Sequence, residues 1–365
     1  MKLLKNFQGK KVLVTGHTGF KGSWLVAWLK SLEANIVGIA LDPPTSPSHF
    51  DAANLKDGIE SIILDIRDSD AVKEVVMKTQ PDFVFHLAAQ ALVRNSYEEP
   101  LTTWNTNLNG TLNILDALRK LKKKCIAVLI TSDKCYDNVE WVWGYRETDR
   151  LGGEDPYSAS KGASELAIRS YIKSFFPKDS SLIRIGSARA GNVIGGGDWA
   201  ENRIIPDCIK AWSKGELVDL RNPNATRPWQ HVLEPLSGYL TQAMALKDKS
   251  ELHGESFNFG PFSIQDNSVV DLVSNMAKYW DQVKWRDVSS EDSGPYEAGL
   301  LKLNCDKALH LMGWYGNMNF EQTLQTTVEW YRSFYKNPEN SDKQTIDQIQ
   351  NYMMQAKDKG IDWAQ

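Results

Sequence analysis

Two residues four positions apart, Tyr157 and Lys161, form the clearest chemical pair in this sequence. On a helix, residues at this spacing lie on one face about one turn apart, so the phenol and the ammonium can reach the same bound molecule. Because an ammonium favours a nearby phenolate, we expect Lys161 to lower the pKa of Tyr157 from about 10 towards the working pH. Tyr157 then suits the role of proton acceptor for an alcohol. The same pair also occurs on ordinary surface helices, so its meaning depends on the rest of the chain.

A glycine-rich segment near the N-terminus predicts a dinucleotide site. The apolar run Lys11–Thr15 predicts a strand, Gly16, Gly19 and Gly22 follow, and an apolar pattern at helical spacing continues from Ser23. Glycines at such a junction allow a tight turn, and the N-terminus of the helix offers free N–H groups to a pyrophosphate. The spacing is G-x-x-G-x-x-G rather than G-x-G-x-x-G, so a glycine turn without a ligand stays an open alternative.

Two acidic residues stand at the ends of the next predicted strands. Asp42 closes the strand 36–42, about twenty residues beyond Gly22, where a carboxylate can bind a ribose 2′-OH and repels a 2′-phosphate. Asp42 therefore favours NAD over NADP. Asp65 closes the strand 61–65, and it can either cap the helix that we expect over 68–78 or reach an adenine.

Three further predicted strands complete an α/β pattern. The strand 81–90 ends in small residues and Gln90, the strand 125–131 is followed directly by Ser132-Asp133-Lys134, and a sixth strand covers 181–189. Strands that alternate with helices predict a parallel, doubly wound sheet, whose ligands lie at the carboxyl ends of the strands. The polar groups from Gly16 to Lys134 all fall at such ends, which predicts one shared site.

Composition and charge exclude several classes of protein. The chain has 365 residues, of which 42% are hydrophobic and 24% charged, and its formal net charge is -4. Because no Lys/Arg run is longer than Lys122–Lys124, nucleic acid is not an expected partner. We find no signal-peptide core and no run of about eighteen apolar residues, so we expect neither export nor membrane insertion.

The cysteines and histidines show no metal-binding pattern. Cys125, Cys135, Cys208 and Cys305 form no C-x-x-C pair, and the six histidines include no H-E-x-x-H. We therefore expect a reduced, cytoplasmic protein without a metal.

Five motifs, in their order and spacing, resemble the extended short-chain dehydrogenase/reductase family of nucleotide-sugar enzymes, over roughly residues 8 to 335. These motifs are Val12–Gly22, His86–Ala89, Thr131–Asp133, Tyr157–Lys161 and Arg189–Gly195. The resemblance is greatest to the branch that dehydrates CDP-glucose, through the segments 16–24, 131–136, 195–199 and 227–232. The branch that acts on dTDP-glucose has Glu where this chain has Lys134.

The resemblance implies a set of site residues and partners. It implies catalytic roles for Ser132, Asp133, Lys134, Tyr157 and Lys161. The cofactor, NAD, is expected to contact Gly16, Thr18, Gly19, Phe20, Gly22, Asp42, Asp65, Ile66, Leu87, Ala88, Ala89, Thr131, Tyr157 and Lys161. The nucleotide-sugar substrate, CDP-glucose, is expected to contact Gln90, Arg94, Ser96, Asn192, Arg203 and Arg227. The family also implies a homo-oligomer, a dimer or tetramer, and a place in the deoxysugar biosynthesis that serves lipopolysaccharide O-antigen.

The implied reaction is a dehydration without net redox change. Tyr157 takes the proton of the sugar 4-OH while hydride passes from C4 to NAD, and Ser132 hydrogen-bonds the same oxygen. A base then removes the acidified C5 hydrogen while an acid protonates the departing 6-OH, and hydride returns to C6. Asp133 suits the acid role if it stays protonated. Lys134 is either the base, and must then be neutral, or a positive charge that stabilises the enolate.

Two other functions remain open at this point. A nucleotide-sugar 4-epimerase, or a 4,6-dehydratase for another base, keeps the fold, NAD and the Tyr157/Lys161 pair, although Asp133 and Lys134 weigh against the epimerase. A regulator that binds NAD without catalysis is a different class, because a fold does not fix a function. The presence of Ser132 together with the other catalytic residues argues against it.

We predict three regions along the chain. Residues 1–190 form a Rossmann-type doubly wound domain that binds NAD, and residues 191–340 form a smaller, mixed lobe that mainly binds the nucleotide sugar and interleaves in part with the first domain. Residues 341–365 are polar and charged, and we expect them to form a peripheral tail.

Overall fold

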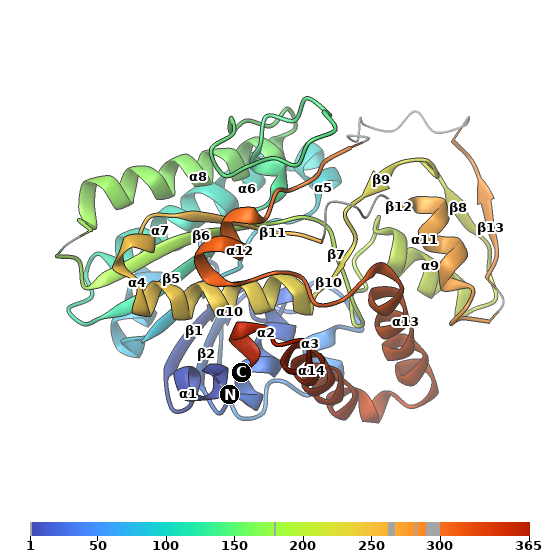
Figure 1. Cartoon of the computed structure of the whole chain (residues 1–365), viewed down its shortest axis with the longest axis horizontal. Coiled ribbons are helices and arrows are strands. Elements are labelled where there is room, and N and C mark those ends of the chain that lie inside the picture. Colours follow the sequence, from blue (N-terminus) through green and yellow to red (C-terminus); the bar gives the residue numbers. More distant parts are fainter. Residues whose placement is uncertain (1, 179, 262–266, 282, 290–299) are drawn as a thin grey trace.

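The computed structural model, which describes residues 2–178, 180–261, 267–281, 283–289 and 300–365, is built around a sheet of seven parallel strands (Figure 1). The strands lie in the order β11-β6-β5-β4-β1-β2-β3. Their bounds are β1 (Lys11–Thr15), β2 (Asn35–Ala40), β3 (Glu60–Ile63), β4 (Phe83–His86), β5 (Cys125–Ile130), β6 (Ile183–Ala190) and β11 (Ser256–Phe259).

Both faces of the sheet are covered by helices, which explains why the strands are apolar almost throughout. Along β1, Val12 and Val14 belong to one buried cluster, whereas Leu13 belongs to the cluster on the opposite face. The face of Leu13 carries α4 (Ser69–Thr79), α7 (Gly110–Leu118) and α8 (Pro156–Phe175). The other face carries α1 (Lys2–Phe7), α2 (Phe20–Ser31), α10 (Leu233–Asp248) and α12 (Asp306–Met312). The predicted doubly wound α/β fold is confirmed.

The strand order reverses between β1 and β4. From β1 the chain proceeds outward to β2 and β3, and it then returns to β4 on the opposite side of β1. The two directions leave a crevice at the carboxyl ends of β1 and β4, where ligands of such sheets bind. Beyond β4 lie α5 (Val93–Glu98), α6 (Pro100–Trp104) and the π-helical segment η1 (Asn105–Asn109), which continues into α7.

A smaller, mixed lobe stands beside the carboxyl ends of the strands, on the right of Figure 1. It contains β7 (Val193–Ile194), α9 (Ile204–Trp212), β8 (Val218–Leu220), β9 (Thr226–Arg227), β10 (Gln230–His231), β12 (Asn267–Ser268), α11 (Val269–Met276), β13 (Trp285–Asp287) and α13 (Phe320–Lys336). The chain passes between the two parts more than once, because β11 returns to the large sheet and pairs with β6.

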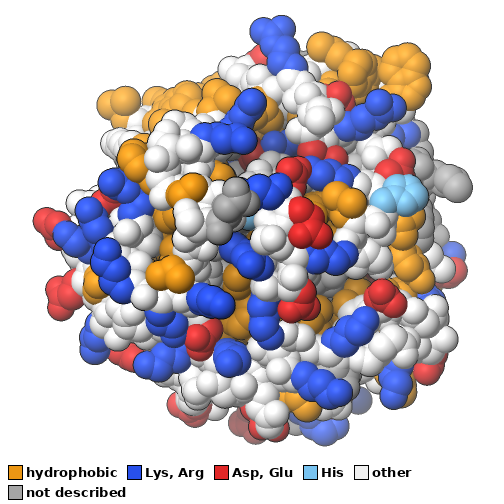
Figure 2. All heavy atoms as spheres, turned by 60° about the vertical axis from the view of Figure 1, so that its left-hand side comes forward, with side chains coloured by type: hydrophobic (Ala, Val, Ile, Leu, Met, Phe, Trp, Pro, Cys, Tyr) orange, Lys and Arg blue, Asp and Glu red, His pale blue; other side chains and the backbone are white. Residues whose placement is uncertain are grey.

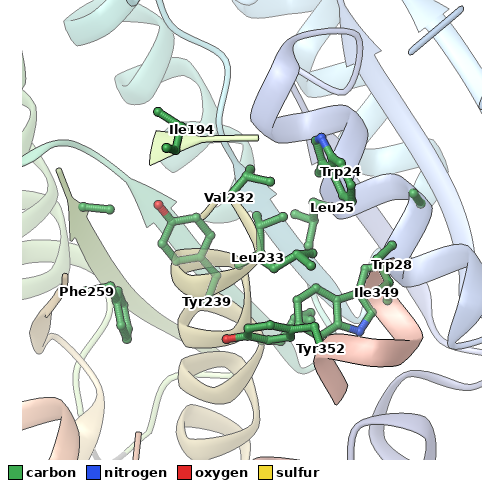
Figure 3. Close-up of a cluster of buried hydrophobic side chains, with 14 of the residues drawn as sticks. Trp24, Leu25, Trp28, Ile194, Val232, Leu233, Tyr239, Phe259, Ile349 and Tyr352 are labelled. Atoms are coloured by element: carbon green, nitrogen blue, oxygen red, sulfur yellow. The ribbon is translucent and has the colours of Figure 1, made fainter. Parts of the chain in front are cut away.

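The segment 341–365, which we expected to be peripheral, lies at the edge of the molecule but is firmly packed. It forms α14 (Ser341–Asp358) and the short turn η5 (Asp362–Ala364) after η4 (Pro338–Asn340). Ile349 and Tyr352 are fully buried, and the ring of Tyr352 lies edge-on to Trp28 of α2, with 5.7 Å between the ring centroids (Figure 3). The polar composition of the helix reflects its exposed face, and its apolar residues recur at helical spacing on the other.

The surface shows mixed charge. On the face in Figure 2, Lys and Arg side chains are spread among Asp and Glu, and hydrophobic side chains gather along the upper edge. No helix in the described part of the chain is both long and apolar enough to cross a membrane. The described residues also hold no group of three or more His, Cys, Asp or Glu side chains placed to bind a metal ion.

The buried carboxyl group of Glu234 in α10 is hydrogen-bonded to the C-terminal helix α14. Glu234 accepts hydrogen bonds from the backbone N–H groups of Asn317 (2.8 Å) and Met318 (2.6 Å) and from the hydroxyl of Tyr352 (3.0 Å). Burial raises the pKa of Glu234 from 4.5 to about 7, although these hydrogen bonds oppose the shift. The folded protein therefore keeps a proton on Glu234 up to about pH 7, whereas the unfolded chain releases it near pH 4.5.

We predict that Glu234 makes the protein less stable as the pH rises between about 4.5 and 7, because the folded state holds more protons than the unfolded state in this window. Glu234→Gln removes the titrating group and keeps an acceptor oxygen. Urea unfolding across this window should show the wild type losing roughly 3 kcal/mol relative to the variant. If the difference in unfolding free energy between the wild type and the variant does not change with pH, the prediction is wrong.

Candidate active site

Nearly all the predicted site residues line one cavity of about 1600 Å³ at the carboxyl ends of the strands. The predicted catalytic and cofactor residues all do so. So do Gln90, Arg94, Asn192, Arg203 and Arg227 among the predicted substrate residues. Residues far apart in the sequence, from Gly16 to Arg227, thus line one cavity, as the α/β pattern predicted.

The glycine turn allows the backbone at the end of β1 to pack tightly. Gly16 has φ +75°, and a Cβ there would lie 2.7 Å from the backbone N of Ala88. A Cβ on Gly22 would lie 2.0 Å from the carbonyl oxygen of Gly16, so α2 can start this close to the turn only with glycine. The result is a helix N-terminus open to the cavity, which fits the pyrophosphate of a dinucleotide.

The two acidic residues that follow the glycine turn, Asp42 and Asp65, both line the cavity but have different surroundings. Asp42 is exposed at the cavity wall, next to Leu41, whose carbonyl accepts a 2.8 Å hydrogen bond from Thr18. Asp65 binds the guanidinium of Arg67, and this hydrogen bond lowers the pKa of Asp65. Asp68, rather than Asp65, caps α4. Asp65 therefore does not cap the helix, and it lines the cavity.

The segment after β5 forms a single turn, η2 (Asp133–Cys135), which Ser132 caps. The Ser132 hydroxyl accepts a hydrogen bond from the backbone N of Lys134 at 3.2 Å and donates one to Asp133 Oδ1 at 3.0 Å. Asp133 is only 2% exposed, and a Cβ on Gly191 would lie 2.9 Å from its Oδ2. Gly191 thus leaves the space that the carboxyl group occupies, while Lys134 is partly exposed beside it.

Tyr157 and Lys161 lie in the first turns of α8, whose N-terminus is capped by Asp155. Both side chains are buried at the cavity wall. Burial raises the pKa of Tyr157 to about 12, a hydrogen bond with Ser132 lowers it, and Asp133 raises it. Burial lowers the pKa of Lys161 to about 8.

The pKa of Tyr157 is raised, whereas we expected it to be lowered, because that expectation considered the charge of Lys161 alone. In the folded chain, desolvation of the phenolate outweighs the favourable charges, because both groups are removed from water. Arg203 is the cation that acts on Tyr157 in the structure.

A buried ion pair holds α8 against the strands. Arg189 of β6 donates to Glu165 of α8 at 2.7 Å, and both side chains are 3% exposed. Glu165 also accepts hydrogen bonds from Thr131 (2.5 Å) and Ser187 (2.9 Å). Because Glu165 follows Lys161 by one turn and Thr131 precedes Ser132, the ion pair fixes the predicted catalytic residues of α8 relative to those that follow β5.

The predicted substrate residues have mixed surroundings. Arg203 pairs with Asp198 at 2.7 Å, and Arg94 donates to Asn202 at 3.3 Å. Ser96, which we predicted to bind substrate, does not line the cavity. Its side chain is fully buried and donates a hydrogen bond to the Val93 carbonyl within α5.

Sequence reasoning missed Lys21. Its ammonium opens to the cavity and donates to the hydroxyl of Tyr239 at 3.3 Å. The pKa of Lys21 is lowered to about 8, mainly by burial and in part by the charges of Arg203 and Lys161, whereas the charge of Asp133 opposes the shift. Lys21 stands inside the glycine segment, where a lysine at the start of an otherwise apolar helix was the available signal.

Comparison with known proteins identifies this chain as a nucleotide-sugar enzyme of the short-chain dehydrogenase/reductase type. A family model described as GDP-mannose 4,6 dehydratase matches residues 13–327, so the chain belongs to that family. It is 46% identical to the CDP-glucose 4,6-dehydratase of Salmonella typhimurium over 337 residues, which cover 91% of this chain and 93% of that protein. It is 25% identical to the UDP-glucose 4-epimerase of Mycoplasma pneumoniae, over 89% of this chain and 97% of that protein.

A solved structure supports the fold. The UDP-glucuronic acid 4-epimerase of Bacillus cereus, in complex with UDP-glucuronic acid and NAD, has a TM-score of 0.75 to this chain at 23% identity. The match covers 89% of this chain and 100% of that one.

We predict that Arg189→Met destabilises the protein by about 3–5 kcal/mol, because it leaves the Glu165 carboxylate buried without its partner. Arg286→Met is the matched control: Arg286 is 61% exposed and pairs with Asp219 on the surface, so its loss should cost less than about 1 kcal/mol. Urea unfolding of both variants measures the difference. Equal losses in the two variants would show that burial of the Arg189 pair is unimportant.

Proposed function

We propose that this chain is a CDP-glucose 4,6-dehydratase that converts CDP-glucose to CDP-4-keto-6-deoxyglucose. The observation that carries the proposal is its 46% identity, over 91% of the chain, to a protein of that name. The cavity supports it, because Asp133 and Lys134 stand beside Tyr157 where a dehydration needs an acid and a base.

NAD fits the cavity as the cofactor. The close approach of Gly16 to Ala88, the open N-terminus of α2 and the exposed Asp42 carboxylate together suit a pyrophosphate and a ribose with a free 2′-OH. When bound there, NAD would supply the hydride acceptor that oxidation at C4 requires and the hydride donor that reduction at C6 requires.

In the first step Tyr157 removes the proton of the 4-OH. The phenolate that this requires is opposed by burial and favoured by the hydrogen bond with Ser132 and the charge of Arg203. Lys161, one turn along α8, adds a positive charge to the same side of the cavity. In this step the Ser132 hydroxyl donates to the sugar oxygen, and it turns back to Asp133, its partner in the structure, once the 4-ketone has formed.

In the second step the ketone makes the C5 hydrogen acidic, and a base and an acid remove it together with the 6-hydroxyl. Asp133 is the acid, since it is shielded from solvent and held by Ser132. Lys134 is the C5 base, because it is the adjacent side chain in the same turn and lines the cavity.

The nucleotide end of the substrate lies towards the smaller lobe. Arg227, Asn192 and Arg203 line this part of the cavity, and guanidinium groups suit a diphosphate because their donors form a rigid fork. Arg203 is positioned for this by its ion pair with Asp198.

The substrate is tested by incubating the purified protein with NAD and, separately, with CDP-, dTDP-, GDP- and UDP-linked glucose. We expect a 4-keto-6-deoxy sugar from the CDP substrate, without net reduction of NAD, because the hydride is returned within each turnover. Product from dTDP-glucose alone contradicts the choice of CDP. Net reduction of NAD contradicts the dehydratase, and a 4-epimer in place of the keto sugar supports an epimerase.

The role of Lys134 is tested by following exchange of the C5 hydrogen with solvent deuterium. Removal of a general base should slow this exchange in Lys134→Ala by about 100-fold. Lys134→Glu should recover part of the rate, since a carboxylate can also accept the proton. Lys78→Ala, which removes a lysine that is 74% exposed, serves as the control. If Lys134→Glu is slower than Lys134→Ala, the lysine acts as a positive charge instead.

A further inference from the structure

Ser132 lies between the two groups that exchange protons with the sugar. Its hydroxyl donates to Asp133 Oδ1 at 3.0 Å, the turn η2 that it caps packs against α8, which carries Tyr157, and its hydroxyl lowers the pKa of that phenol. The three side chains are 6%, 2% and 7% exposed, so bulk water has little access to them. The backbone N–H of Lys134 donates to the Ser132 oxygen, which leaves the hydroxyl hydrogen free to point at Asp133.

The proposed dehydration moves one proton from one side of this group to the other. The 4-OH loses a proton to Tyr157, the 6-OH needs a proton to leave as water, and the C5 proton is returned to carbon. Over a turnover the enzyme therefore takes one proton at Tyr157 and gives one at Asp133. Without a connection, both residues would have to exchange protons with solvent in every cycle.

We propose that Ser132 is a proton relay that passes the proton taken from the 4-OH by Tyr157 on to Asp133, which gives it to the departing 6-hydroxyl. The inference rests on the proposed function. It assigns Ser132 a role in water elimination in addition to its contact with the sugar oxygen.

The protons and electrons balance along this route. When water leaves, the Asp133 O–H bond breaks and its proton joins O6, while the C6–O electron pair leaves with that oxygen. The C5–H proton goes to Lys134, and its electron pair forms the C5=C6 double bond. In the same step the Ser132 proton moves to Asp133, and the Tyr157 proton moves to Ser132. Tyr157 has then passed on the proton that it took from the 4-OH, and Asp133 has regained the proton that it gave to O6, so no proton from solvent is needed.

The surroundings favour such an internal transfer. The negative charge of Asp133 raises the pKa of Tyr157, so the pair resists holding two negative charges and shares one proton more readily. Lys21 and Arg203 lie near enough to stabilise that single negative charge wherever it resides.

A single turnover with CDP-glucose, quenched and reduced with borodeuteride, separates the two chemical steps, because the 4-keto intermediate and the 4-keto-6-deoxy product yield different labelled sugars. In Ser132→Ala we expect elimination to slow by about 100-fold and the 4-keto intermediate to accumulate. Ser132→Thr keeps a hydroxyl and a cap for η2, so it should restore elimination. Unfolding midpoints of both variants show whether the turn stays folded.

A second measurement uses the wild type alone. If three protons move as water leaves, the elimination rate should depend on the deuterium fraction of the solvent along a curve, whereas transfer from Asp133 alone gives a straight line. A straight line overturns the relay. So does a Ser132→Ala protein that slows only the oxidation and accumulates no 4-keto intermediate. If the wild type makes no 4-keto-6-deoxy sugar from any nucleotide sugar, the proposed function fails instead.

Discussion

The ion pair between Arg189 and Glu165 is the constraint on which the candidate site depends. The two charged groups are buried and lie 2.7 Å apart. Such a pair is stable only when its other donors and acceptors also find partners, and here several elements supply these partners. Glu165 accepts from Thr131 at the end of β5, and Arg189 donates to Tyr136, whose own hydroxyl reaches Asn258 of β11. The pair thus joins α8, which carries the tyrosine and lysine, to the strand end that carries the serine and acid.

Residues distant in the sequence pack against α2, the helix that follows the glycine turn on the other side of the cavity. His49 of α3 (His49–Ala52) stacks on Trp24 of α2 and hydrogen-bonds both Ser23 of α2 and Thr345 of α14. Burial lowers the pKa of His49 to about 3, so this bridge stays neutral at ordinary pH. The C-terminal helix therefore stabilises the helix whose N-terminus faces the cavity, although it contributes no predicted site residue.

The sequence allowed the fold and most of the site to be predicted, for a physical reason. Strand ends follow from local apolar runs, and the rule that parallel strands place their carboxyl ends together brings Gly16, Asp42 and Ser132 to one edge. Ser96 was misplaced because its direction depends on how α5 packs, which local periodicity does not fix. Lys21 and the packed face of α14 were missed because each depends on a distant partner, Tyr239 in one case and α2 in the other.

The surroundings of Tyr157 show why one oxidising group can serve different reactions. A phenol and an ammonium one turn apart allow an alcohol to be oxidised, and nothing in them determines the fate of the ketone. Burial makes the phenolate costly, with a pKa of about 12, so the proton that Tyr157 takes up must be passed on before the next cycle. In the relay that we propose, the hydroxyl of Ser132 connects Tyr157 to Asp133, a carboxyl group with 2% exposure that accepts a hydrogen bond from Ser132. An acid held at that position can protonate a leaving hydroxyl, and this turns an oxidation into a dehydration.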